Sequence, residues 1–106
     1  NYPALKFSLN GLANISKSQG KYEEAESYLK RALAIAEKVA GKESADKMET
    51  LNALARLYRV QGRYSEAQAA LKDVIEIGEK NLGADSPSMK PYLSNLATVY
   101  FYQKKY

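Results

Sequence analysis

Amide and basic side chains recur in this sequence at spacings that place them on one face of a helix. They stand at i, i+4 and i+7 in two stretches, as Asn10, Asn14 and Lys17 and as Asn52, Arg56 and Arg59. Residues at these spacings lie on the same side of an α-helix. An asparagine amide can donate to and accept from a peptide backbone at once, and an arginine can hold a carboxylate through two parallel hydrogen bonds. The row therefore suits recognition of a peptide, and a solvated helix face is the alternative interpretation.

This chain contains few of the residues that usually carry out catalysis or bind metal ions. The 106 residues include no His and no Cys, which removes the commonest general base, the thiolate nucleophile and the usual zinc ligands. Two acidic groups occur, Glu23, Glu24 and Glu26 in the first and Glu43, Asp46 and Glu49 in the second. Acidic residues favour the start of a helix, and the second group lacks the alternating oxygen ligands of a calcium loop. We expect no enzyme activity, no metal site and no cofactor.

The composition predicts one small globular domain without a membrane span. Hydrophobic residues make up 45% of the chain and charged residues 26%, and no apolar run approaches the length of a bilayer-spanning helix. The net charge of +4 comes from 16 basic and 12 acidic residues. Because both signs alternate, the dense basic block of a nucleic-acid arm is missing, and we do not expect nucleic acid as the partner. Residues 1–10 carry no signal-peptide pattern, and a signal that was cleaved off or lies upstream would leave no trace. The location is therefore unknown, with the cytoplasm as the default.

An internal repeat of 42 residues organises the chain. Residues 9–13 read LNGLA, and residues 51–55 read LNALA. The same shift aligns further pairs, which are Gln19 with Gln61, Gly20 with Gly62, Glu24 with Glu66 and Ala25 with Ala67. We interpret the chain as a single domain, 1–106, with repeat 1 at about 2–43, repeat 2 at about 44–85 and a partial repeat 3 at about 86–106.

Each repeat predicts two helices. Apolar and small residues in the first repeat follow i, i+3, i+4 and i+7 until Gly20 interrupts the stripe, and a second stripe ends at Gly41. Helices are therefore expected at about 3–19, 22–40, 44–61, 64–82 and 87–104, with no strand. Because a single helix pair cannot bury both of its apolar faces, the pairs should stack into an all-α solenoid.

Glycine, serine and proline predict local features at the ends of these helices. Gly20 and Gly62 are expected at positive φ, where they let the chain turn back tightly. Ser44 and Ser86 suit the N-cap position. Pro91 stands five residues into the last predicted helix, where it lacks an N–H and its ring clashes with the preceding turn. We therefore expect a kink, or a separate turn before a helix that starts near Pro91.

The stretch 54–67 carries the run Leu-Ala-x-x-Tyr-x-x-Gln-Gly-x-Tyr-x-Glu-Ala. This run resembles the tetratricopeptide repeat (TPR), and the 42-residue period resembles the longer repeat of kinesin light chains. The resemblance implies a TPR-like, right-handed α-solenoid of antiparallel helix pairs that acts as a protein–protein interaction scaffold. Ser16 departs from the pattern, because Tyr58 and Tyr100 stand at the equivalent places.

In this family the first helices of successive pairs line a concave groove that holds an extended peptide. The resemblance implies a peptide groove lined by Asn10, Asn14, Lys17, Glu49, Asn52, Arg56, Arg59, Asn95, Thr98 and Tyr102. Three cations against Glu49 leave this row a net charge of +2, which is compatible with the acidic cargo peptides of kinesin light chains. The carboxylate clamp of Lys, Asn and Arg found in some members is not matched, since only Asn14 fits it.

A structural role is the second hypothesis. Leu93, Ala97 and Tyr100 form an apolar row on the last predicted helix, and no further helix follows in the sequence to cover it. We expect the chain to be a piece of a longer solenoid in which the next helix covers this row. In the isolated chain, another copy should cover it, which would produce self-association through the open C-terminal helix.

Overall fold

Helices make up nearly all of the described chain. A computed structural model describes residues 2–41, 45–83 and 85–105, and this part contains no strand. The helices are α1 (Tyr2–Ser18), α2 (Tyr22–Ala40), α3 (Asp46–Val60), α4 (Tyr64–Leu82), the 3₁₀-helix η1 (Pro87–Met89) and α5 (Lys90–Lys105). The predicted bounds of the first four helices are confirmed to within two residues. The all-α prediction is confirmed as well.

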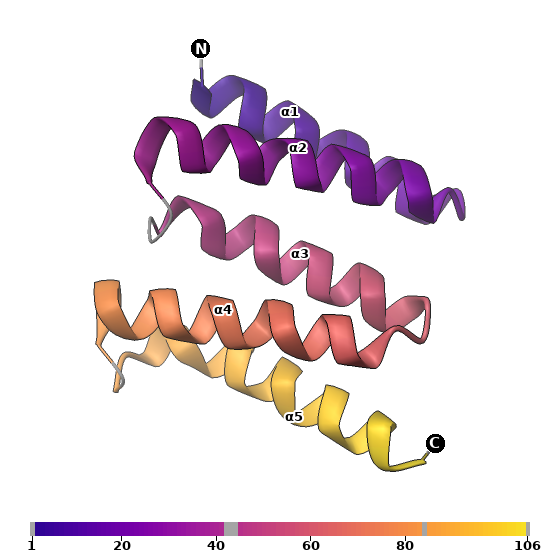
Figure 1. Cartoon of the computed structure of the whole chain (residues 1–106), viewed down its shortest axis with the longest axis vertical. Helices are drawn as coiled ribbons and strands as arrows, with labels where there is room; N and C mark the ends of the chain where they lie inside the picture. The colour runs from indigo at the N-terminus through magenta and orange to yellow at the C-terminus, as the bar shows by residue number, and fades with distance from the viewer. Residues whose placement is uncertain (1, 42–44, 84, 106) are drawn as a thin grey trace.

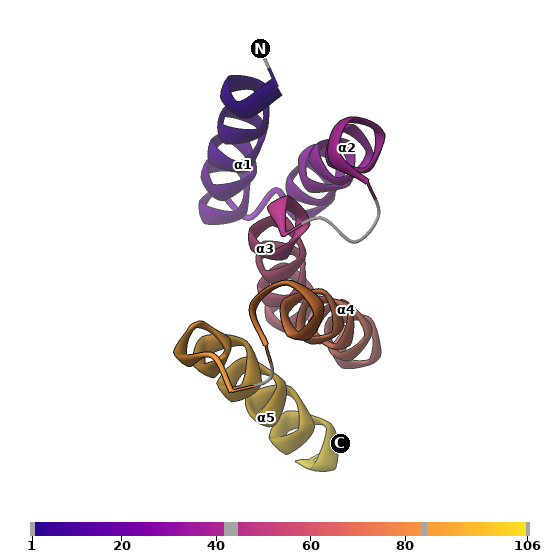
Figure 2. The same cartoon turned by 90° about the vertical axis from the view of Figure 1, so that its left-hand side faces the viewer.

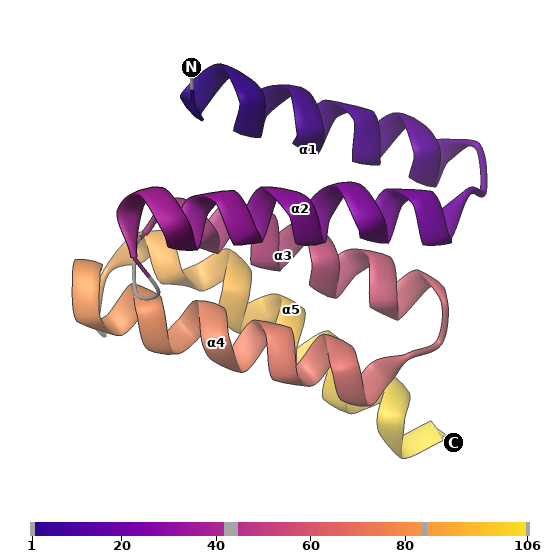
Figure 3. The ribbon, with the colours of Figure 1, turned by 45° about the horizontal axis from the view of Figure 1, so that its top comes forward.

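The helices stack as a solenoid of antiparallel pairs. Neighbours in sequence are neighbours in space, because α1 packs against α2, α3 against both α2 and α4, and α5 against α4. The turns that join α1 to α2 and α3 to α4 lie at the same end of the stack (Figures 1 and 3). Figure 2 shows α1, α3 and α5 along one side and α2 and α4 along the other. We call the surface formed by α1, α3 and α5 the odd-helix face.

Alanine at the helix crossings lets the axes approach closely. Ala25 in α2 and Ala67 in α4 are completely buried, and both stand at equivalent places in the repeat. Leu29 and Leu71, one turn further along, fill the space beside them and are 3% and 1% exposed. Burying apolar surface contributes roughly 25 cal/mol for each Å² removed from water. These repeated Ala–Leu pairs therefore hold each even-numbered helix in its place.

The two tight turns between paired helices have the same geometry, as the repeat predicts. Gly20 and Gly62 have φ of 78° and 77°, which confirms the expected positive φ. In each turn the next residue donates its backbone N–H across the turn at 2.8 Å, Lys21 to the Ser16 carbonyl and Arg63 to the Tyr58 carbonyl. The turn geometry therefore requires glycine for its backbone conformation.

The last helix begins later than the sequence pattern predicts, and proline is the reason. Pro87 opens the separate short helix η1, whose N-cap Ser86 accepts a hydrogen bond at Oγ from the Ser88 N–H at 3.3 Å. The helix α5 starts at Lys90, so Pro91 occupies its first turn, where a missing N–H has no partner to lose. The predicted start at 87 is wrong, and the predicted separate turn is confirmed. The Ser44 cap lies outside the described residues.

Candidate functional site

Every residue of the predicted peptide groove belongs to an odd-numbered helix. Helix α1 carries Asn10, Asn14 and Lys17, helix α3 carries Glu49, Asn52, Arg56 and Arg59, and helix α5 carries Asn95, Thr98 and Tyr102. The structure brings the middle of this set together around a small pocket of about 10 Å³ at the junction of α1 and α3, closed underneath by α2, which we call the α1–α3 cleft. Its lining residues are Ala13, Asn14, Lys17, Ala25, Leu29, Ala53, Arg56 and Leu57. The cleft thus has an apolar floor with an amide and two cations around it.

Three positive charges gather at this cleft. Lys17 and Arg56 line it, and Arg59 follows Arg56 by one helical turn on α3. The pKa of Lys17 is lowered from its ordinary value, first by burial and then by repulsion from Arg56 and Arg59. Among the described residues, none of the three forms an ion pair with an acidic side chain. The cluster therefore carries positive charge that no ion pair with a described residue compensates.

The asparagines of the row join the odd-numbered helices to one another. Asn10 on α1 accepts a hydrogen bond at Oδ1 from the Thr50 hydroxyl on α3, at 3.3 Å. Asn52 on α3 accepts one at Oδ1 from Nδ2 of Asn95 on α5, at 2.9 Å. These bonds fix the amide planes of Asn10 and Asn52, which stand at equivalent places in the repeat. Thr50 was not among the predicted residues, because its buried position depends on how the helices stack.

The remaining predicted groove residues lie away from the cation cluster. Glu49 is exposed and stands seven residues before Arg56, about 10 Å along α3. Thr98 donates its hydroxyl to the Ser94 carbonyl within α5 at 3.0 Å. Tyr102 stacks on Tyr64 of α4 with ring centroids 5.8 Å apart. These three side chains therefore do not take part in the α1–α3 cleft.

Charge is segregated between the two sets of helices. The odd-numbered helices contain eight basic and two acidic residues, a net of +6. The even-numbered helices contain five basic and eight acidic residues, a net of −3. The sequence alternates charges along the chain, and the fold separates most of them because odd and even helices lie on opposite sides of the solenoid (Figure 2). Lys47 of α3 is an exception, because it is buried and pairs with Glu37 of α2 at 2.7 Å.

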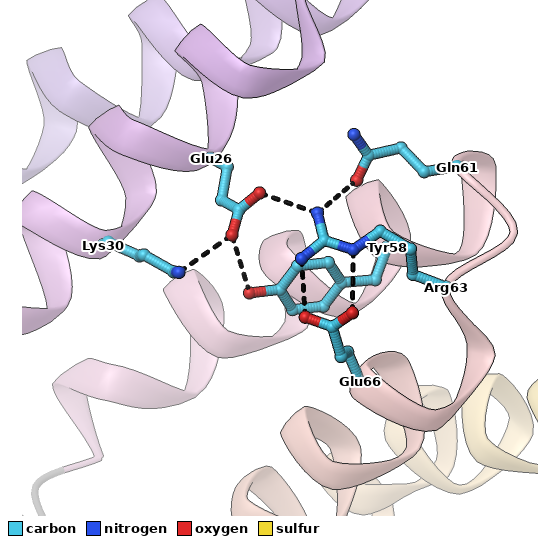
Figure 4. Close-up of polar contacts among 6 residues, drawn as sticks. All are labelled: Glu26, Lys30, Tyr58, Gln61, Arg63 and Glu66. Atoms are coloured by element: carbon cyan, nitrogen blue, oxygen red, sulfur yellow. Dashed lines mark hydrogen bonds and ion pairs between the residues drawn. The ribbon is translucent and has the colours of Figure 1, made fainter.

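A second polar cluster joins α2 to the turn between α3 and α4 (Figure 4). Arg63 lies at its centre and donates from Nη1 to Glu26 Oε1 at 2.8 Å and from Nη2 to Glu66 Oε2 at 2.6 Å. The Tyr58 hydroxyl donates to Glu26 Oε2 at 3.3 Å, and the Lys30 ammonium lies 2.9 Å from the same oxygen. The guanidinium carbon also sits 4.6 Å from the centre of the Tyr58 ring. We call this cluster the Arg63 network.

The electrostatics of the Arg63 network follow from its ion pairs. The hydrogen bond from Arg63 is the main reason that the pKa of Glu26 falls to about 2, and Lys30 adds to it against the opposing effect of burial. The pKa of Glu66 is lowered by the same guanidinium, and the pKa of Arg63 is raised. The sequence pattern indicated only that Glu26 favours a helix start, and its ion pairs with Arg63 and Lys30 were not predicted. Gln68 replaces Glu26 in the next repeat, so the repeat gave no signal for it.

Clusters of metal-ligating side chains and helices able to span a membrane are both absent from the described part of the chain. Between residues 2–41, 45–83 and 85–105, no group of three or more His, Cys, Asp or Glu side chains could hold a metal ion. The helices described in these ranges are all too short or too polar to cross a membrane.

Comparisons with known proteins agree with the helix stacking and the repeat. A family model described as tetratricopeptide repeat matches residues 7–80. The crystal structure of BtubC (BKLC) from P. vanneervenii is 28% identical with a TM-score of 0.85, over 93% of this chain and 40% of that one. A Podosopora anserina protein described as a kinesin light chain with nearly identical TPR-like repeats is also 28% identical. One of its structures has a TM-score of 0.84 over 99% of this chain and 50% of that one.

A second structure of that protein has a TM-score of 0.79 over 92% of this chain and 46% of that one. The chain therefore spans half or less of the length of each of these structures. A comparison with curated proteins finds no match.

Proposed function

Because the chain belongs to the tetratricopeptide repeat family, with repeats of the kinesin light chain type, we propose that it binds an acidic peptide segment of a partner protein along the odd-helix face. Repeats of this family generally mediate protein–protein interaction, and the fold typically serves as a non-enzymatic scaffold. The observation that carries the proposal is the charge of the odd-numbered helices, +6 against −3 on the even-numbered ones.

The polar groups on this face suit an extended backbone and acidic side chains. Asn10 and Asn52 have their Oδ1 atoms occupied by neighbouring odd helices, so the Nδ2 group of each is the donor left for a ligand carbonyl. The guanidinium groups of Arg56 and Arg59 can each hold a carboxylate through two hydrogen bonds. Opposite charge on the partner would also speed the encounter.

Calorimetry with three peptides of equal length, rich in Glu, Lys or Ser, tests the proposal. We expect the Glu-rich peptide to bind with a dissociation constant on the order of micromolar, equivalent to about −8 kcal/mol. The double variant Arg56→Ala and Arg59→Ala should weaken it about tenfold, because desolvated ion pairs with the ligand are lost. Equal binding of all three peptides would overturn the proposal.

The matched control is the double variant Arg31→Ala and Lys72→Ala. It removes the same net charge from exposed positions on the even helices α2 and α4. We expect it to bind the Glu-rich peptide as the parent chain does, apart from a small long-range effect that salt suppresses. If both double variants weaken binding equally, the effect comes from overall charge and the odd-helix face is not the site.

Self-association is the second candidate function, and the packing of α5 favours it. Leu93 and Tyr100 on this helix are 48% and 39% exposed, whereas their equivalents Leu51 and Tyr58 on α3 are each 7% exposed. An apolar row of this kind is a common feature of interaction surfaces. Light scattering over a range of concentrations tests this. A mass that rises with concentration and falls back in Leu93→Lys would support association, and a constant monomer mass would exclude it.

A further inference from the structure

The cations at the α1–α3 cleft differ from the other well-placed arginine of this chain. Arg63 is bonded to two carboxylates, Glu26 and Glu66. Arg56 and Arg59 have no acidic partner among the described residues. Arg56 lines the α1–α3 cleft together with Lys17, and Arg59 follows Arg56 by one turn of α3. Gathering like charges without compensation opposes folding. A cluster of like charges that lowers stability in this way is expected at functional sites.

We propose that the α1–α3 cleft is a phosphate-binding site, in which Lys17, Arg56 and Arg59 hold the phosphate monoester of a phosphorylated side chain in the bound peptide. This inference rests on the proposed function for the source of the phosphate, and it adds the chemical class of the anion. Because the cleft has a volume of only about 10 Å³, room for about one water molecule, the phosphate would lie at its mouth and not inside it. Asn14 lines the same place and would add a neutral donor.

Charge matching favours a phosphate monoester over a carboxylate. A carboxylate brings one negative charge, so two of the three cations would stay uncompensated. A phosphate monoester carries about −1.5 to −2 at pH 7 and offers three acceptor oxygens. Two planar guanidinium groups and one ammonium supply donors from several directions, which a group with three oxygens can use at once.

The walls of the cleft strengthen this preference. Its floor is made by small and aliphatic side chains, among them Ala13, Ala53 and Leu57, and the last is only 1% exposed. Charge–charge attraction is stronger beside such a floor than on an open surface, because less water screens it. Lys17 is half-buried and lines the same cleft. An anion of higher charge therefore gains more here than it would on an exposed helix.

A titration with small probes tests the site without any knowledge of the partner. The ¹⁵N-labelled chain is titrated with N-acetyl-O-phosphoserine methylamide, and separately with the glutamate and serine analogues. We expect the phosphoserine probe to shift backbone amides around 14–17 on α1 and 53–59 on α3, and to bind about tenfold more tightly than the glutamate probe. Equal affinity for the phosphoserine and glutamate probes would overturn the proposal.

Variants assign the effect to the cluster. The double variant Arg56→Ala and Arg59→Ala should lose the phosphoserine response while its spectrum stays that of a folded chain, and Lys17→Met should weaken it. The charge-matched control Arg31→Ala and Lys72→Ala should keep it. An unchanged response in the Arg56 and Arg59 variant would overturn the site.

Further measurements distinguish the phosphate site from the acidic-peptide function and from nucleic-acid binding. If phosphorylated and unphosphorylated Glu-rich peptides bind equally and both need Arg56 and Arg59, the acidic-peptide function stands and the phosphate site falls. If the phosphoserine probe binds but no Glu-rich peptide does, the phosphate site stands and the acidic-peptide function falls. A single-stranded RNA that binds more tightly than phosphopeptides, with an affinity that falls steeply as salt rises, would replace the peptide source by nucleic acid and overturn the proposal.

Discussion

Arg63 and Arg56 belong to the same helix pair, but only Arg63 has carboxylates within hydrogen-bonding distance among the described residues. Arg63 bonds to Glu26 on α2 and to Glu66 on α4, so its charge is used to join helices. Arg56 lines the α1–α3 cleft and bonds to no described carboxylate. The residue type alone therefore does not decide whether an arginine is structural or available to a ligand. The carboxylates within reach decide it.

At the residue scale, Glu26→Gln should destabilise the chain by about 1–2 kcal/mol at neutral pH, because charge-assisted hydrogen bonds to Arg63 and Lys30 are lost. The pKa of Glu26 is lowered from 4.5 to about 2 in the folded chain. Its contribution to stability is therefore full above pH 4.5 and disappears as the pH falls toward 2. Urea unfolding of both chains at several pH values measures this.

The control for that experiment is Glu23→Gln, which removes a carboxylate from the exposed first turn of the same helix. It should change the free energy of unfolding by a few tenths of a kcal/mol at most. A difference between Glu26→Gln and the parent chain that stays constant from pH 7 down to pH 2 would show that the Arg63 network does not depend on the charge of Glu26.

The pKa of Lys17 should rise when its cationic neighbours are removed. Burial lowers this pKa first, and Arg56 and Arg59 lower it further, so Arg56→Gln with Arg59→Gln should recover only part of the shift. In the parent chain, the folded state holds fewer protons than the unfolded state as Lys17 titrates. Stability attributable to Lys17 therefore increases as the pH rises between its folded pKa and 10.5.

An NMR titration of the lysine side-chain carbon next to the ammonium reports the pKa of Lys17 directly. Arg31→Gln, on the far side of the solenoid, should leave the titration curve in place. A Lys17 pKa that is the same in the parent chain and the Arg56 and Arg59 variant would mean that the three charges do not meet at the cleft.

At the scale of elements, glycine and proline made the helix boundaries predictable, because their backbone limits act locally. Gly20 and Gly62 fixed the turns, and Pro91 required the separate turn that η1 provides. The face that carries the groove row was predictable from the helical period. The contacts of this row were not predictable, since Thr50 bonds to Asn10 and Asn95 bonds to Asn52 across neighbouring helices, and only the offset between stacked pairs brings these partners together.

A comparison of two alanine substitutions tests the requirement for glycine in the turns. Gly62 in the turn and Gly11 in α1 both have room for a Cβ, since no atom lies within 4 Å of where it would be. Of these two glycines, only Gly62 has a positive φ, so Gly62→Ala should cost about 1–2 kcal/mol of stability. Gly11→Ala should stabilise the chain by up to about 1 kcal/mol, because alanine is the better helix former.

Thermal or urea unfolding of the two variants provides the measurement, and steric crowding cannot explain a difference between them. Gly20→Ala serves as a repeat of the test in the equivalent turn, where φ is 78°. If Gly62→Ala and Gly11→Ala have the same stability, backbone conformation at the turn is not what requires glycine there.

At the scale of the whole molecule, stacking gives the solenoid two chemically different sides and leaves one apolar row uncovered. On α1 and α3 the equivalent rows are covered by the following helix, whose alanines and leucines pack onto them. On α5 the row of Leu93, Ala97 and Tyr100 is exposed, and no described helix covers it. The opposite side of α5 packs as expected, with Val99 only 1% exposed in the core against α4.

The last prediction follows from this uncovered row. Appending a copy of residues 65–82 directly after Tyr106 places a helix of the α4 type where the repeat requires one. Its copies of Ala67 and Leu71 should cover Ala97 and Tyr100, as the originals pack with Ala55 and Tyr58 of α3. Its copies of Val74 and Ile77 should cover Leu93, as the originals pack with Leu51. Burying these side chains should add several kcal/mol of stability at roughly 25 cal/mol for each Å² of apolar surface. Unfolding midpoints measure the gain, and hydrogen exchange should show slower opening of α5.

The control appends the same segment with lysine in place of its copies of Ala67 and Leu71. It keeps the length and the turn but cannot pack onto the row, so we expect no gain in stability and no added protection of α5. Equal stability of the two extended chains would show that the row does not bind a helix in the way that α3 does. The exposed face of α5 would then need a different explanation from the one that the 42-residue repeat provides.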